Sequence, residues 1–175
     1  LVRIKEFMAL YGLVDIRMRM LRIPELTDEV LRGIGRVHLV GCGTAMHAGM
    51  VGKAAIETLA RVPAEVDIAS EFRYRNPILR PNDLVIIISQ SGETSDTLAA
   101  LKLAKSRGVP VLAIVNVVGS SIARAADHVL YTYAGPEIAV ASTKAYMVQL
   151  CVLYLFALRL AYARGQLTEE KTKYY

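Results

Sequence analysis

The chain has 175 residues, of which 54% are hydrophobic and 21% charged, a composition that fits one globular domain and excludes a disordered chain. Its net charge of +5 comes from scattered basic residues, without the basic runs interleaved with aromatics that are typical of nucleic-acid-binding proteins. The two cysteines have neither metal-ligand nor disulfide spacing and no secretory signal is evident, so we expect a reducing, cytoplasmic compartment.

The first part of the chain is helix-prone but irregular. Residues 1–22 are expected to be helical, and Pro24 ends this segment because the residue before a proline is pushed out of helical geometry. Thr27 is then expected to cap a short helix through Arg32, which has acidic residues in its first turn. The sequence therefore predicts an N-terminal helical segment over residues 1–34.

From residue 35 onward, short apolar runs alternate with segments of helical length. The predicted strands are 37–40, 66–68, 84–88, 111–115 and 129–132, and the predicted helices are 45–61, 70–75, 94–107, 120–126 and 145–163. The run Leu84–Ile88 is apolar without alternation, which indicates a strand buried on both faces. Strands that alternate with helices predict an α/β fold with a parallel sheet of about five strands and right-handed crossovers.

The last predicted helix raises the question of a membrane span. Its apolar stretch from Ala145 to Ala163 is nearly long enough to cross a bilayer, with Gln149 and Arg159 as the main polar interruptions. The rest of the chain predicts a soluble α/β unit, which needs helices to cover its sheet. We therefore expect a buried core or interface helix and no membrane partner.

The loop Ser89-Gln90-Ser91-Gly92-Glu93-Thr94 carries the clearest functional signal. Ligands of open α/β sheets bind at the carboxyl ends of the strands, and this loop joins the most buried strand to a helix. A helix start offers free N–H groups and the positive end of the helix dipole, which attract an anion. The hydroxyls of Ser89, Ser91 and Thr94 and the amide of Gln90 add neutral donors, so we expect phosphate or carboxylate binding. The alternative is that Thr94 only caps the helix.

Two further loops at strand ends are rich in small residues. The segment Gly41-Cys42-Gly43-Thr44-Ala45-Met46 half-matches the dinucleotide-binding fingerprint, but Met46 replaces the third glycine and no acidic residue follows at the spacing that holds a ribose. It predicts a tight turn with no nicotinamide cofactor, and no other cofactor or metal is expected. In the segment 135–144, Ser142 and Thr143 suit helix capping and ligand contact equally.

Glu137 and His47 are the candidate acid/base residues. Glu137 precedes the last helix and fits a general base, and His47 lies just after the glycine turn. A lone histidine is more often a packed or interface residue, so both interpretations of His47 stay open. His38 and His128 lie in strand-like runs and are expected to be structural.

Five segments in order resemble the SIS (sugar isomerase) domain family, namely residues 41–44, 69–74, 88–94, 116–121 and 134–144. More narrowly, they resemble the first of the two SIS domains of the glutamine–fructose-6-phosphate aminotransferase family. The resemblance implies a flavodoxin-like three-layer α/β/α sandwich over residues 35–165. It also implies that residues 166–175 begin a linker to a second domain.

The same resemblance implies a homodimer that binds a small sugar phosphate, fructose 6-phosphate or glucosamine 6-phosphate. Ser89, Gln90, Ser91 and Thr94 would hold the phosphate, and the sugar would lie against Thr44, Ala45, Val140, Ala141 and Ser142. The family usually has serine where this chain has Ala45, so one hydroxyl contact would be lost. The family's ring-opening and isomerising groups come from the second SIS domain and the C-terminal tail, so no catalytic residue is expected in this chain.

Two other functions stay open at this point. A free-standing sugar-phosphate isomerase would use Glu137 and His47 as its acid/base groups. A transcription regulator would use the domain as a ligand sensor.

Overall fold

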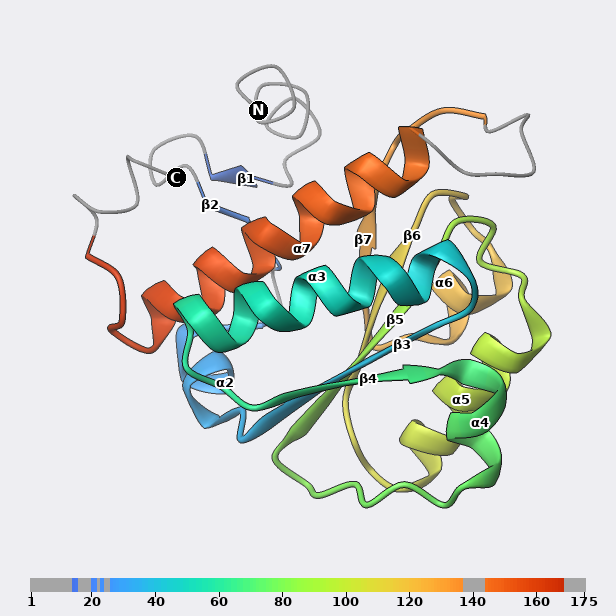
Figure 1. Ribbon diagram of the computed structural model, residues 1–175, viewed down its shortest axis with the longest axis horizontal. Coiled ribbons are helices and arrows are strands. Elements are labelled where there is room, and N and C mark those ends of the chain that lie inside the picture. The colour runs from blue at the N-terminus through green and yellow to red at the C-terminus, as the bar shows by residue number, and fades with distance from the viewer. Residues whose placement is uncertain (1–13, 16–19, 22, 24–25, 137–143, 169–175) are drawn as a thin grey trace.

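A five-stranded parallel sheet in the order β4-β3-β5-β6-β7 forms the middle layer of this computed structural model, which describes residues 14–15, 20–21, 23, 26–136 and 144–168 (Figure 1). All four strand pairs are parallel. The strands are β3 Arg36–Gly41, β4 Ala64–Ile68, β5 Asp83–Ser89, β6 Val111–Val115 and β7 His128–Tyr131. The predicted α/β fold with about five parallel strands is confirmed.

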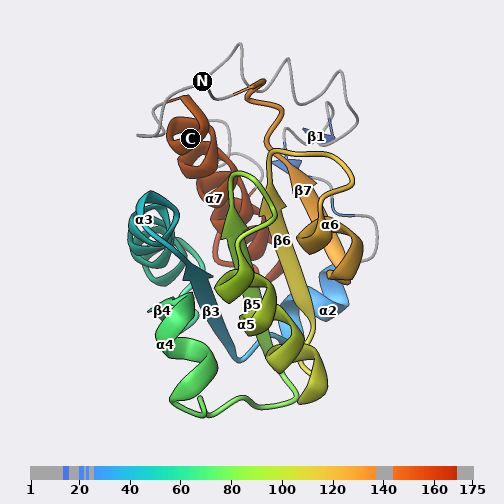
Figure 2. The same cartoon turned by 90° about the vertical axis from the view of Figure 1, so that its right-hand side faces the viewer.

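Helices cover both faces of the sheet and complete a three-layer sandwich (Figures 1 and 2). One face carries α3 Thr44–Leu59 and α7 Lys144–Ala163, and the other carries α4 Ala69–Tyr74, α5 Ser95–Ser106 and α6 Ser121–Ala125.

Alternate residues of β5 divide between the two cores, because successive side chains of a strand point to opposite faces. Leu84, Ile86 and Ile88 pack on the α3/α7 side, and Val85 and Ile87 on the α4/α5/α6 side. Every residue of β5 is buried, as its unbroken apolar run predicts.

The predicted elements from residue 35 onward are all present, and their ends differ from the prediction by at most two residues. Gly108 follows α5 with φ +72°, the left-handed conformation that commonly ends a helix. The pattern of periodicity and turn residues was therefore sufficient to locate these elements.

The N-terminal segment differs from the prediction. Val14–Asp15 (β1) and Met20–Leu21 (β2) form a short antiparallel pair, so the helix expected over residues 1–22 is wrong at these four positions. The short helix that follows is confirmed as α2, Asp28–Gly33, and the Thr27 hydroxyl accepts a hydrogen bond from the Val30 N–H at 3.4 Å.

Helix α7 is the one helix in the described part of the chain that is long and apolar enough to cross a membrane, and 56% of its apolar window is buried inside the fold. It lies along α3, where a Cβ on Gly52 would come within 3.0 Å of the Leu153 side chain. The glycine thus lets the two helices approach closely. The prediction of a core helix is confirmed by this packing.

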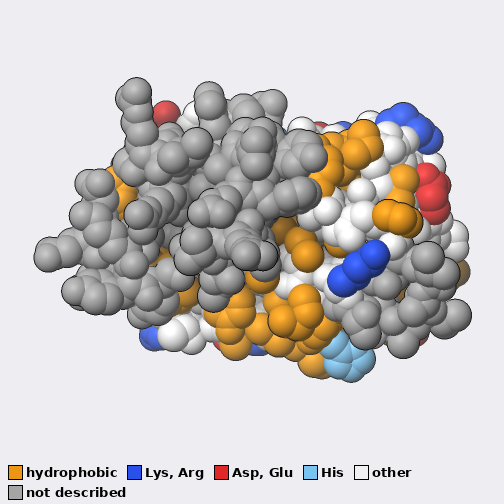
Figure 3. Space-filling model, turned by 90° about the horizontal axis from the view of Figure 1, so that it is seen from above, with side chains coloured by type: hydrophobic (Ala, Val, Ile, Leu, Met, Phe, Trp, Pro, Cys, Tyr) orange, Lys and Arg blue, Asp and Glu red, His pale blue; other side chains and the backbone are white. Residues whose placement is uncertain are grey.

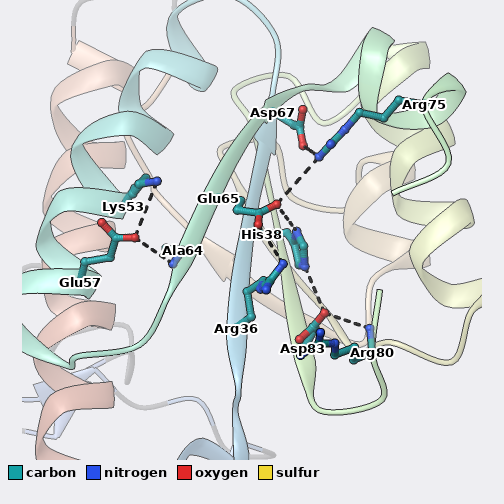
Figure 4. Close-up of polar contacts among 10 residues, drawn as sticks. All are labelled: Arg36, His38, Lys53, Glu57, Ala64, Glu65, Asp67, Arg75, Arg80 and Asp83. Carbon is teal, nitrogen blue, oxygen red and sulfur yellow. Dashed lines mark hydrogen bonds and ion pairs between the residues drawn. The ribbon is translucent and has the colours of Figure 1, made fainter. Parts of the chain in front are cut away.

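A buried polar pair joins β3 to β5 (Figure 4). His38 Nε2 lies 3.2 Å from Asp83 Oδ2, and both side chains are 2% exposed. Asp83 also accepts a hydrogen bond from the Arg80 N–H at 2.9 Å. On the other side of the ring, Glu65 lies 3.8 Å from His38 Nδ1 and pairs with Arg36 at 2.8 Å. His38 therefore has the structural role expected from its place in a strand.

We predict that Asp83→Ala lowers the free energy of unfolding by about 2 to 3 kcal/mol, because it leaves the His38 ring and the Arg80 N–H without an acceptor. Urea denaturation followed by circular dichroism measures the change. Glu65→Ala is the control, since that carboxylate is 44% exposed and its loss should cost about 1 kcal/mol or less. Equal losses in the two variants would contradict the assignment of Asp83 as the essential partner.

Candidate functional site

The loops that follow β3 and β5 lie at the topological switch point of the sheet. The chain runs from β3 to β4 on one side and then returns to place β5 on the other side of β3. Crevices outside the carboxyl ends of such neighbouring strands are where open α/β sheets bind ligands. Two of the three predicted loops therefore meet at the position that the fold favours for a ligand.

The Ser89–Thr94 loop is shaped by its own hydroxyls. Ser89 is 4% exposed, and its Oγ accepts a hydrogen bond from the Gly92 N–H at 3.0 Å. The Ser91 Oγ accepts from the Glu93 N–H at 3.2 Å. Gly92 has φ +68°, which a residue with a side chain adopts only under strain. The loop thus has a defined shape before any ligand arrives.

Thr94 occupies the N-cap position of α5 without capping it. Its side chain accepts no hydrogen bond from the first turn, and its Oγ1 instead lies 3.4 Å from the Ser89 Oγ. In α2 and α6, by contrast, Thr27 and Ser120 accept such bonds. The interpretation of Thr94 as a simple helix cap is therefore wrong, and the start of α5 has no capping hydroxyl from this residue.

The segment from the end of β6 to the first turn of α6 holds the same loop from the other side. The Asn116 N–H donates to the Gln90 carbonyl at 3.1 Å, and the Ile122 N–H donates to the Gly92 carbonyl at 3.0 Å. The Glu93 carboxylate accepts a hydrogen bond from the Ser121 N–H at 2.7 Å. Sequence reasoning assigned no role to Glu93, and the spacing of 28 residues between the two partners gives no local signal for it.

Asn116 also holds the stretch that begins the third loop. Its Nδ2 donates to the Gly135 carbonyl at 2.8 Å, and its Oδ1 accepts from the Ala134 N–H at 2.7 Å and from the Thr132 hydroxyl at 3.0 Å. Asn116 therefore connects the Ser89–Thr94 loop, through its backbone N–H, to the exit from β7, through its side chain. The candidates Glu137, Val140, Ala141 and Ser142 lie outside the described residues.

The glycine turn after β3 is tight, as predicted. Gly43 is the N-cap of α3 with φ +57° and no side-chain cap. Thr44 is exposed at the start of the helix, whereas Ala45 is 7% exposed and its methyl group belongs to the α3/α7 core. Cys42 Sγ lies 3.7 Å from the Thr97 Oγ1, which connects this turn to the first turn of α5.

His47 lies one turn into α3 and is exposed. Its Nδ1 is 2.9 Å from the Gly43 carbonyl, so this nitrogen carries a proton and donates it to the hydrogen bond. Within the described ranges, no group of three or more His, Cys, Asp or Glu side chains is arranged to hold a metal ion.

A separate apolar hollow of about 530 Å³ lies between α3 and α7. Ala54, Thr58, Leu150 and Tyr154 are among the side chains that line it. Exposed hydrophobic side chains gather on this side of the molecule (Figure 3), and Met147 and Tyr154 of the hollow are among the exposed ones. This surface lies on the helices and is distinct from the loops at the sheet's edge.

Relatives of the chain are much longer than the chain itself. Over 147 residues it is 60% identical to a protein of Clostridium tetani named glutamine–fructose-6-phosphate aminotransferase [isomerizing]. Over 144 residues it is 59% identical to a Streptomyces coelicolor protein of the same name. The matches cover 84% and 82% of this chain but only 24% and 23% of those proteins.

Solved structures agree with these relatives. The C-terminal domain of glucosamine-fructose-6-phosphate aminotransferase from Francisella tularensis superposes with a TM-score of 0.82 at 42% identity, covering 87% of this chain and 43% of that one. A Clostridium difficile protein described as a "putative phosphosugar isomerase" superposes with a TM-score of 0.80 at 22% identity, covering 99% of this chain and 46% of that one, which supports the fold alone. The SIS domain family matches residues 30–159. The chain therefore belongs to the SIS domain family.

Proposed function

We propose that this chain is the sugar-phosphate-binding domain of a glutamine–fructose-6-phosphate aminotransferase (isomerizing), with fructose 6-phosphate or glucosamine 6-phosphate as its ligand. The observation that carries the proposal is the Ser89–Thr94 loop, pre-shaped and without a threonine cap at the start of α5. The proposal is also supported by the 60% sequence identity to a relative named glutamine–fructose-6-phosphate aminotransferase.

The proposed phosphate contacts follow from the donors that the loop offers. Ser89, Gln90, Ser91 and Thr94 supply hydroxyl and amide donors, and the start of α5 adds N–H groups and the positive end of the helix dipole. The loop itself has no Lys or Arg. The phosphate would therefore be held by many neutral donors in a fixed arrangement.

The proposed sugar contacts come from the glycine turn and the third loop. Thr44 and Ala45 lie at the start of α3, and Val140, Ala141 and Ser142 complete the set. The methyl group of Ala45 packs in the α3/α7 core. A serine hydroxyl that pointed in the same direction would make little contact with the ligand. We therefore infer that the replacement of serine by alanine is compatible with binding.

Binding without turnover is the expected behaviour of the isolated chain. The family's ring-opening groups are implied to lie in a second SIS domain and a C-terminal tail, and this chain spans about 24% of its relatives' length. A cytoplasmic location is part of the proposal. A free-standing isomerase would instead interconvert aldose and ketose phosphates, so a coupled isomerase assay separates the two functions.

Self-association through the α3/α7 face is also part of the proposal. The hollow there is mostly apolar, and Met147 and Tyr154 are 58% and 47% exposed, which costs free energy in water. A second copy that covered this face would remove that surface from water.

Glucosamine 6-phosphate is expected to bind the wild-type chain, and Thr94→Val is expected to weaken binding about tenfold, because a hydroxyl donor to a charged phosphate is lost. Isothermal titration calorimetry measures both dissociation constants. Thr168→Val, the same change at an exposed position beyond α7, is the matched control. No heat from the wild-type chain at millimolar ligand, or equal affinities for both variants, would count against the proposal.

Gly92→Ala is expected to weaken binding and to lower stability by about 1 to 3 kcal/mol, because the residue has φ +68° and its new Cβ would lie 2.1 Å from the Ser120 Oγ. Thermal denaturation and calorimetry report the two effects. Gly165→Ala is the control: it has φ +70° but open space and lies beyond α7, so only stability should fall. A Gly92→Ala chain with undiminished affinity would disprove the importance of this loop shape.

Tyr154→Glu is expected to shift the chain from dimer to monomer, since it buries a carboxylate at the centre of the proposed contact. Sedimentation velocity at several protein concentrations measures the mass. Tyr74→Glu, at an exposed position on α4, should leave the mass unchanged. A wild-type chain that sediments as a monomer throughout would exclude self-association through this face.

A further inference from the structure

Glu93 is an acidic residue inside a loop that is proposed to bind a dianion. A carboxylate close to a phosphate repels it, and a loop without Lys or Arg has no cation of its own to offset that repulsion. The position of this side chain therefore needs a physical reason.

The structure directs the Glu93 carboxylate toward the start of α6. Its Oε1 accepts a hydrogen bond from the Ser121 N–H at 2.7 Å, across 28 residues of sequence. Hydrogen bonds from the Ser121 hydroxyl and from that N–H, with the nearby charge of Arg124, hold the pKa of the Glu93 carboxyl below its ordinary value. The group is therefore an ionised acceptor at neutral pH, and its charge is directed at donors outside the loop.

Two backbone bonds lie on either side of this contact. The Ile122 N–H reaches the Gly92 carbonyl at 3.0 Å, and the Asn116 N–H reaches the Gln90 carbonyl at 3.1 Å. The start of α6 is itself held, because Ser120 caps it and the Arg124 guanidinium donates to the Gly119 carbonyl. The Glu93 carboxylate thus ties the loop to a fixed support.

We propose that Glu93 is a positioning residue: its carboxylate locks the Ser89–Thr94 loop onto the start of α6 and so holds the loop's donors in the arrangement that receives phosphate. The proposal rests on the proposed function for its effect on binding. The lock itself exists in the chain without ligand and is testable there.

Removing the carboxylate separates this role from simple charge repulsion. Glu93→Ala deletes a negative charge, so repulsion alone predicts tighter binding of glucosamine 6-phosphate. Positioning predicts the opposite, and we expect the dissociation constant to rise about tenfold. Glu93→Gln keeps an oxygen acceptor for the Ser121 N–H and should stay within about threefold of the wild type. Unchanged or tighter binding by Glu93→Ala would overturn the proposal.

A second variant removes the donor instead of the acceptor. Ser121 is the first residue of α6, where proline is tolerated, and Ser120 before it has ψ 163°, as a residue before proline requires. Ser121→Pro therefore deletes the N–H with little disturbance of the helix. We expect Ser121→Pro to weaken ligand binding as much as Glu93→Ala does. The double variant Glu93→Ala/Ser121→Pro should bind no more weakly than either single variant. Ser121→Ala removes only the hydroxyl and should have a smaller effect. Full additivity of the two losses would contradict the lock.

Amide hydrogen exchange in the ligand-free chain tests, independently of ligand binding, whether the Glu93 carboxylate holds the loop against α6. The Ile122 and Asn116 amides should exchange faster in Glu93→Ala than in the wild type. Asp127→Ala is the matched control, because that carboxylate accepts a hydrogen bond from the Val111 N–H at 2.9 Å at the start of β6, at the end of the sheet opposite the candidate site. It should lower stability without altering the exchange of those two amides or ligand affinity.

These measurements distinguish a failure of the proposed function from a failure of the proposed role of Glu93. A wild-type chain that binds no sugar phosphate would refute the proposed function, while faster exchange at Ile122 in Glu93→Ala would still support the lock. Wild-type exchange at both amides in Glu93→Ala would overturn the positioning role whether or not ligand binds.

Discussion

The parallel pairing of β3 with β5 is the contact on which the candidate site depends. The two strands pair without interruption from Arg36 opposite Asp83 to Gly41 opposite Ile88. Because β4 lies on the other side of β3, the loops that follow β3 and β5 separate at the carboxyl edge and leave a place for a ligand between them. A slip of one residue would exchange the faces of the wholly buried β5, so two cores fix this register together.

A rigid edge matters because the candidate phosphate donors are neutral. A flexible loop would lose conformational entropy on binding and would first have to orient each hydroxyl, whereas a pre-shaped loop avoids most of that cost. The internal bond of Ser89 to the Gly92 N–H and the bridge from Asn116 to Gln90 supply this order from within the fold. Asn116 extends the same order to the exit from β7. The loops are thus organised as one unit and not as independent turns.

Local patterns predicted the fold well and the contacts of the site less well. The apolar run of β5 and the glycine after α5 identify their elements because strand burial and helix termination are local properties. Pairing between distant residues has no such signature. The bond from Glu93 to Ser121 depends on how β6 and β5 lie together. The contact of Thr94 with Ser89 lies within one loop and depends on the shape that this loop adopts. The β1–β2 pair was missed because two-residue strands carry too short a pattern to distinguish from a helix.

Two carboxylates at the described part of the carboxyl edge have protein partners. Glu93 is bonded to Ser121, and Asp96 pairs with Arg73 at 2.8 Å. A general acid or base must instead direct a titratable group at the substrate. Hydroxyls and backbone N–H groups keep one protonation state across the physiological range, so they recognise a phosphate without transferring protons to the sugar. The neutral donors of this edge therefore fit the phosphate-binding role proposed for it, which requires no proton transfer by the loop itself.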